Sequence, residues 1–180
     1  MSSKILVLPG DGIGVEVADQ AIRVIEKLNE QGLNASYEKD LVGGASYDVN
    51  GEPLTNSVLE KAKNSDAILL GAVGGSKWDD VERSKRPEAG LLGLRKELEL
   101  FANLRPALVF DALVSASTLK NEVVNNLDIM IVRELTGGVY FGQPRGIEDT
   151  PNGKKAIDTQ IYYDYEIDRI ARVAFDLARK

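Results

Sequence analysis

Short apolar runs alternate with amphipathic stretches along the first hundred residues of the chain. The apolar runs predict strands at residues 4–8, 34–39 and 66–71. Between them, apolar side chains recur at helical spacing in residues 15–29 and 57–63, where Ser57 and Glu60 have the spacing of a capping box. Strands that alternate with helices in this way favour an α/β layer with a largely parallel sheet.

The pattern changes after Pro106. The apolar residues 127–132 predict another buried strand, and residues 137–141 and 156–163 predict two extended pieces around a polar loop at 143–155. Together they indicate a β-excursion, that is, a protruding arm of two extended segments that pairs with another chain. Asp164 is suited to cap a last helix, which reaches Lys180 without a stop signal. The extended pieces and the bare ending both favour missing sequence.

The amino-acid composition limits which residue types can take part in catalysis and which classes of partner are expected. The chain of 180 residues has a net charge of −6, no cysteine and no histidine. Its length fits one domain or parts of two, and its charge argues against a nucleic-acid surface. Disulfides and thiolate nucleophiles are excluded, and acid–base chemistry falls to Asp, Glu, Lys or Tyr. No apolar run approaches the roughly 18 residues of a membrane span or resembles a signal peptide, so a cytoplasmic protein is expected.

Against this acidic background, three arginines lie beside apolar, glycine-punctuated backbone. Arg95 falls in a predicted helix, Arg105 precedes a proline, and Arg133 ends a predicted strand. Because guanidinium groups grip carboxylates with paired hydrogen bonds, they suggest a pocket for a small acid with several carboxylates. Arg95 could equally be a solvated helix charge. Tyr140, among glycines, could face a ligand or simply pack in a sheet.

Two glycine-rich turns follow predicted strands. Gly10-Asp-Gly-Ile-Gly14 lacks the dinucleotide fingerprint spacing, which leaves a tight turn or a nucleotide-binding turn open. Gly71-Ala-Val-Gly-Gly-Ser-Lys-Trp78 follows the strand end where open α/β sheets bind ligands, and Lys77 there could meet a phosphate. A flexible surface loop is the alternative.

Taken together, these segments resemble the amino-terminal half of the isocitrate/isopropylmalate dehydrogenase family, and its isopropylmalate branch in particular. The matching stretches are Leu8–Gly14, Gly71–Trp78, Arg86–Leu92, Leu94–Leu98, Asn103–Pro106 and Val132–Gly142. The resemblance implies an incomplete α/β fold of that family, a parallel-rich sheet flanked by helices plus the β-arm. Residues 1–100 would belong to the first, NAD-binding domain, and residues 101–180 to a partial second domain with the arm at about 137–163.

The resemblance also implies a role for each matching residue. Tyr140 would be the catalytic acid that helps protonate the enol carbon after carbon dioxide leaves. The substrate residues would be Arg95, Arg105 and Arg133 for the carboxylates, and Leu91, Leu92 and Glu88 for the isopropyl group. The NAD residues would be Ile13 and, in the span from 75 to 87, Gly75, Ser76, Lys77, Trp78 and Pro87. The chain departs from the family pattern at Ser76 and Val15, where proline is usual.

The activity implied is NAD-dependent oxidative decarboxylation of (2R,3S)-3-isopropylmalate to 4-methyl-2-oxopentanoate in leucine biosynthesis, by a homodimer with Mg²⁺ or Mn²⁺. The family's catalytic lysine and three metal-binding aspartates lie in its second half. This chain is therefore expected to be a fragment, inactive alone and without metal ligands of its own. The alternatives are a sister dehydrogenase acting on tartrate, isocitrate or homoisocitrate, a non-catalytic carboxylate-binding module, or a partial gene product without a stable fold.

Overall fold

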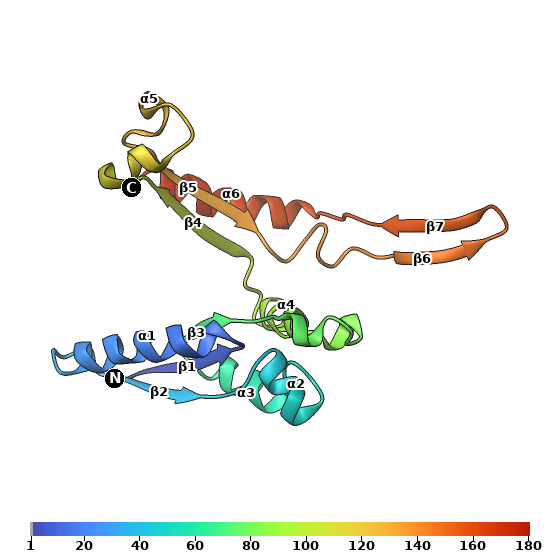
Figure 1. The fold of residues 1–180 in the computed structure, drawn as a ribbon, viewed down its shortest axis with the longest axis horizontal. Helices are drawn as coiled ribbons and strands as arrows, with labels where there is room; N and C mark the ends of the chain where they lie inside the picture. The colour runs from blue at the N-terminus through green and yellow to red at the C-terminus, as the bar shows by residue number, and fades with distance from the viewer. Residues whose placement is uncertain (1) are drawn as a thin grey trace. The chain divides into compact units, whose positions relative to one another are not determined.

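The computed structural model describes residues 2–180, which form two compact units. In the sequence, the first unit ends at Leu98 and the second begins at Glu99. Unit 1 contains, in chain order, β1 (Ser3–Gly10), α1 (Ile13–Asn29), β2 (Ala35–Lys39), α2 (Gly44–Asn50), α3 (Asn56–Lys63), β3 (Ala67–Ala72), 3₁₀ turns at Ser76–Trp78 and Arg83–Lys85, and α4 (Pro87–Glu97). Unit 2 contains β4 (Ala102–Leu108), a 3₁₀ helix at Asp111–Ala116, α5 (Asn121–Val124), β5 (Asp128–Glu134), β6 (Arg145–Thr150), β7 (Gly153–Asp158) and α6 (Asp164–Ala178). Figure 1 labels these helices and strands.

The sheet of unit 1 is parallel, with strand order β2-β1-β3. Leu6 and Leu8 on one face of the central strand β1 belong to a cluster with residues of α3 and α4, and Val7 on the other face packs against Ala18 and Ile22 of α1. All three side chains are buried because helices cover both faces of the middle strand. The expected α/β class, a parallel sheet flanked by helices, is confirmed.

The turn from β1 to α1 is tight. Gly10 and Gly12 have φ of +74° and +52°, a backbone region that disfavours other residues. A side chain at Gly14 would collide with the carbonyl of Pro9, so β1 and α1 approach each other closely here. This geometry is the tight turn that was one of the two interpretations of residues 10–14.

Helix α2 was not predicted, because Gly43-Gly44 and Asn50-Gly51 at its two ends are typical of chain breaks. Gly43 instead caps its amino end and Gly51 its carboxyl end, with φ of +74° and +75°. The cap expected for α3 is also wrong, since the Thr55 hydroxyl rather than Ser57 accepts the backbone N–H of Val58, at 3.2 Å.

In unit 2, β4 and β5 form an antiparallel ribbon, the β4–β5 ribbon, and α6 contacts β5. The strand expected at 127–132 is present, but its burial was predicted wrongly. Ile129, Met130 and Ile131 are 49%, 44% and 50% exposed. A ribbon of two strands cannot cover both of its own faces, which explains the exposure.

The β-excursion has a different layout from the expected one. Its strands are β6 and β7, which form an antiparallel hairpin. β6 and the first half of β7 lie in the segment predicted as a loop, the end of β7 overlaps the extended piece predicted at 156–163, and residues 137–141 are not a strand. Cross-strand ion pairs join Arg145 to Asp158 at 2.9 Å and Lys155 to Glu148 at 2.8 Å. Polar pairs hold this hairpin, so apolar alternation could not reveal it. Its pairing with another chain stays a prediction.

Helix α6 begins one residue earlier than the predicted cap at Asp164 implied. Tyr163 precedes the helix, and the Glu166 carboxylate accepts the Tyr163 backbone N–H at 2.9 Å, while Asp164 is the first helical residue. Among residues 2–180, no helix combines the length and apolar character that crossing a bilayer requires.

Candidate active site

Two of the three predicted arginines share one face of the β4–β5 ribbon. Arg105 lies opposite Ile131, and Arg133 lies opposite Asn103. Side chains directly opposite each other in an antiparallel pair share a face, as do residues two apart in a strand. Arg105 and Arg133 are therefore diagonal neighbours around Ile131, and both are exposed. A pair of guanidinium groups at this spacing can hold two carboxylates of one small acid.

Tyr140 joins this face through Arg133. The Arg133 guanidinium donates a hydrogen bond to the Tyr140 hydroxyl oxygen, and its Cζ lies 5.5 Å from the centre of the tyrosine ring. Because the phenol oxygen accepts from the arginine, its own proton remains available for donation to another group. The structure thus brings a carboxylate-binding group and a proton donor into direct contact.

A half-buried carboxylate holds the turn between Arg133 and Tyr140. Glu134 accepts the backbone N–H groups of Thr136 at 2.8 Å and Gly137 at 2.7 Å, and pairs with Arg169 of α6 at 3.0 Å. Burial raises the pKa of Glu134, but the hydrogen bonds from Gly137, Thr136 and Arg169 outweigh it and hold the pKa below its ordinary value of 4.5. Sequence analysis assigned no role to Glu134 or Arg169, although a glutamate followed by Thr-Gly-Gly is a usable turn signal.

We expect Glu134→Gln to lower the free energy of unfolding by about 1–3 kcal/mol at pH 7, because Arg169 loses its charged partner. A depressed carboxyl pKa stabilises the fold above the ordinary value of 4.5, and this stabilisation is lost as pH falls through the folded-state pKa. Urea unfolding at pH 7 and at about pH 3 should therefore show a gap between the two proteins that narrows in acid. Glu122→Gln, at a carboxylate exposed in its pair with Lys120, is the matched control. Equal stability of Glu134→Gln and wild type at pH 7 would contradict the expectation.

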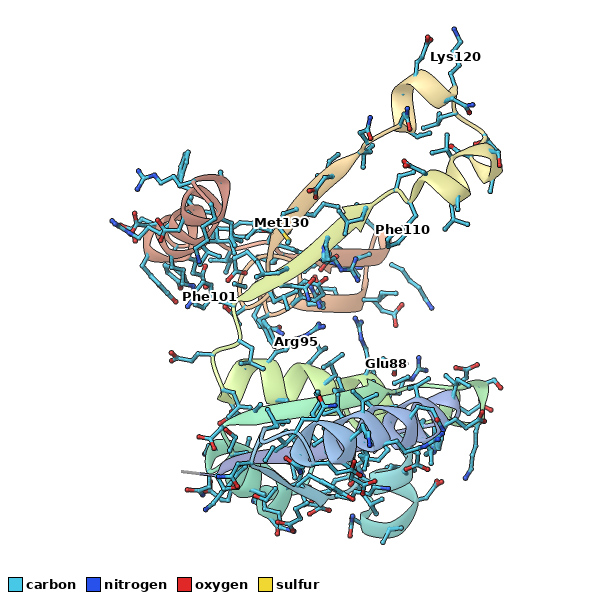
Figure 2. All side chains as sticks on the ribbon, turned by 90° about the vertical axis from the view of Figure 1, so that its left-hand side faces the viewer. Glu88, Arg95, Phe101, Phe110, Lys120 and Met130 are labelled. Carbon is cyan, nitrogen blue, oxygen red and sulfur yellow. The ribbon has the colours of Figure 1, made fainter. Side chains whose placement is uncertain are left out.

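The third arginine belongs to unit 1, in α4. Counting along the helix, Glu88, Leu91, Leu92 and Arg95 follow the spacing i, i+3, i+4 and i+7, so the four residues form one stripe of α4. Figure 2 labels Glu88 and Arg95 on this helix. The opposite side of α4 is buried through Gly90, where a side chain would lie 2.6 Å from the Pro53 carbonyl oxygen. The stripe carries an acid, an apolar pair and a base in sequence.

The predicted cofactor residues are spread over the carboxyl ends of β1 and β3, also in unit 1. The segment 74–78, here the 74–78 loop, ends in a 3₁₀ turn rather than a flexible coil. Lys77 is paired with Asp48 of α2 at 2.5 Å, and Trp78 Nε1 donates to the same carboxylate at 3.0 Å. These two bonds hold the pKa of Asp48 below its usual range. Lys77 is thus engaged by an acid, and its contact with a phosphate stays a prediction.

The remaining predicted cofactor residues are Ile13, Pro87, Gly75 and Ser76. Pro87 is fully buried at the start of α4, and Ile13, the first residue of α1, is 60% exposed. A side chain at Gly74 would lie 2.8 Å from the Glu88 carboxylate, so Glu88 lies against the loop backbone. Gly75 and Ser76 are exposed. Sequence analysis missed Asp11, a buried acid that hydrogen-bonds this loop; its place between two glycines was the available signal.

Comparison with known proteins agrees with these assignments of fold. The family described as isocitrate/isopropylmalate dehydrogenase matches residues 4–180. The 3-isopropylmalate dehydrogenase of Chromohalobacter salexigens is 60% identical over 100% of this chain and 50% of its own length. That of Rhodopseudomonas palustris is 62% identical over 98% of this chain and 48% of its own length. The chain spans about half the length of the curated relatives it matches.

Solved structures of dehydrogenases share the fold of this chain. A β-decarboxylating dehydrogenase from Thermococcus kodakarensis matches 98% of this chain and 46% of its own with a TM-score of 0.68 and 32% identity. Isocitrate dehydrogenase from Methylococcus capsulatus matches 98% of this chain and 48% of its own with a TM-score of 0.71 and 29% identity. The match runs through the sheet of unit 1, the β4–β5 ribbon and α6. The chain belongs to the isocitrate/isopropylmalate dehydrogenase family.

Proposed function

We propose that this chain supplies the amino-terminal half of an NAD-dependent 3-isopropylmalate dehydrogenase of leucine biosynthesis. The enzyme oxidises (2R,3S)-3-isopropylmalate and releases carbon dioxide to give 4-methyl-2-oxopentanoate. One observation carries the proposal: Arg105 and Arg133 share a face of the β4–β5 ribbon, and Arg133 donates to Tyr140. The names of relatives about 60% identical to this chain support the choice of substrate.

Substrate binding falls to the arginines in this proposal. Arg105 and Arg133 hold carboxylates of the malate by charge-assisted hydrogen bonds. The family resemblance gives Arg95 of α4 the same task. Leu91 and Leu92 offer the isopropyl group an apolar surface, since a carboxylate at this position would lack a polar partner. Tyr140 donates its phenol proton to the enol carbon once carbon dioxide has left.

The residues of unit 1 fit a nicotinamide dinucleotide. The 74–78 loop follows β3 at the carboxyl edge of the sheet, where open α/β sheets bind their ligands, and the exposed Ile13 follows β1 at the same edge. Glu88 lies against the loop backbone, and the family resemblance gives it a place near both the nicotinamide and the isopropyl group. NAD, when bound, accepts the hydride from the alcohol carbon of the substrate. Ile13, the residues Gly75–Trp78 and Pro87 would hold it.

The described residues, 2–180, contain no group of three or more acids able to hold a metal ion. In this proposal the ligands for Mg²⁺ or Mn²⁺ and the catalytic lysine come from the second half of the family's protein, and Arg105, Arg133 and Tyr140 supply binding and proton transfer. The homodimer, the cytoplasmic location and the absence of a nucleic-acid partner belong to the same proposal.

The test uses a completed enzyme, a chimera of residues 1–180 of this chain followed by the carboxyl-terminal half of the Chromohalobacter salexigens relative. Its rates with NAD and Mg²⁺ are compared on isopropylmalate, tartrate, isocitrate and homoisocitrate. We expect isopropylmalate to be preferred, because Leu91 and Leu92 favour an apolar substituent. Preference for another acid would identify a sister dehydrogenase.

The 180-residue chain alone provides the second arm of this test. We expect no turnover from it, because the catalytic lysine and metal ligands are missing. Calorimetric titration of this chain with isopropylmalate tests the alternative that the chain is a non-catalytic carboxylate-binding module. Saturable binding by the chain together with an inactive chimera would favour the module over the enzyme.

A further inference from the structure

Asp11 is the most deeply buried acid of unit 1 that the proposed chemistry leaves without a role. The residue is 4% exposed, and its carboxylate accepts three backbone N–H groups: Ala45 on Oδ1 at 2.7 Å, and Gly44 and Gly74 on Oδ2, each at 2.9 Å. The donors come from two segments that lie far along the chain, the start of α2 and the start of the 74–78 loop. A carboxylate that receives three amide protons is well satisfied in a buried place, and its hydrogen bonds are stronger than neutral ones.

These bonds fix the 74–78 loop at its first residue. The far end of the loop is held to α2 as well, because Lys77 and Trp78 both donate to Asp48. The Trp78 indole also lies directly against Gly44, where any side chain would collide with it. Asp11 therefore ties the start of α2 to the start of the loop, while Asp48 ties the body of α2 to the end of the loop.

The position of Glu88 depends on the same arrangement. Its carboxylate lies against Gly74, the residue whose N–H is bound to Asp11. A displaced Gly74 would move the backbone on which Glu88 rests and would release the indole of Trp78 from α2. The two predicted cofactor elements, the loop and Glu88, thus share one anchor.

We propose that Asp11 is a positioning residue that sets the place of the 74–78 loop and, through it, of Glu88. The identity of the bound ligand as NAD rests on the proposed function; the anchoring itself does not. Asparagine at this position has the same shape but only one acceptor oxygen. Its NH₂ group would face at least one of the backbone N–H groups, donor against donor, and the loop would be released.

Trp78 is the only tryptophan in the sequence, so its fluorescence reports the loop without any ligand. In the 180-residue chain, Asp11→Asn is expected to shift Trp78 emission to longer wavelength and to increase quenching by acrylamide, while far-ultraviolet circular dichroism is retained. Asp66→Asn is the matched control, because Asp66 also accepts a backbone N–H of unit 1, that of Lys4 at 2.7 Å, but is exposed. A folded Asp11→Asn protein with wild-type emission and quenching overturns the proposal.

A second measurement covers the case in which Asp11→Asn does not fold. In the wild-type chain, the amide protons of Gly44, Ala45 and Gly74 are expected to exchange slowly with solvent, and fast exchange at Gly74 overturns the anchor.

In the chimera, Asp11→Asn is expected to raise the KM for NAD by about tenfold and to leave the KM for isopropylmalate unchanged. Loop release without an effect on NAD would contradict the proposed cofactor site and leave the anchor standing.

Discussion

Replacing Tyr140 with phenylalanine is expected to lower kcat of the completed enzyme by about 10²- to 10⁴-fold, the usual contribution of a positioned proton donor. The KM for isopropylmalate should change little, because Arg105 and Arg133 keep their places on the ribbon. The Tyr140 oxygen accepts from Arg133 in the structure, so phenylalanine removes both the phenol proton and this hydrogen bond. Steady-state kinetics with isopropylmalate, NAD and Mg²⁺ measures the effect.

Tyr163→Phe is the control for this substitution. Tyr163 is in the same unit, is 58% exposed and stacks on Tyr165 through its ring, which phenylalanine preserves. Its kcat should equal that of the unaltered chimera. If Tyr140→Phe also retained full kcat, the assignment of Tyr140 as the acid would be wrong, and the proton would have to come from outside the described residues.

The second large effect is expected from Arg105→Ala. Loss of two charge-assisted hydrogen bonds to a carboxylate costs about 3–4 kcal/mol, which corresponds to roughly 10²- to 10³-fold in kcat/KM for isopropylmalate. Arg105→Lys keeps the charge but not the planar fork, so an intermediate loss is expected. Binding of the acid to each variant, measured by calorimetry, should fall in the same order.

Arg172→Ala is the matched control for the arginine variants. Arg172 is an exposed arginine of unit 2 whose partner is Asp168, one turn earlier on α6, at 2.7 Å. Its removal should leave kcat/KM unchanged. Wild-type affinity in Arg105→Ala would show that the ribbon face does not hold the substrate carboxylates.

Unit 1 was well predicted from the sequence because its burial follows simple periodicities. Leu6, Val7 and Leu8 form a continuous apolar run, as expected for a central parallel strand that helices cover on both faces. Helix α2 was missed because the group that caps it, the Asp11 carboxylate, comes from 33 residues earlier in the chain. A local window contains the glycines at its ends but not that contact.

Unit 2 was predicted less well for a related reason. The β6–β7 hairpin has exposed polar residues on its strands and is paired by charges such as Arg145 with Asp158, so it carries little apolar signal. In the candidate site, the arginines were selected from their places beside strands and helices, and their binding role stays a prediction. The bond from Arg133 to Tyr140 and the pair of Glu134 with Arg169, 35 residues apart, depend on how the chain folds back and could not be predicted.

The strand order of unit 1 has a consequence for synthesis on the ribosome. The middle strand, β1, is the first to be translated, and β2 and β3 are added later to its two opposite edges. Each new strand therefore finds a vacant edge when it emerges, and none has to separate two strands that are already paired. The sheet can grow outward in the order in which its residues are made, and no hydrogen bond formed early has to be broken later.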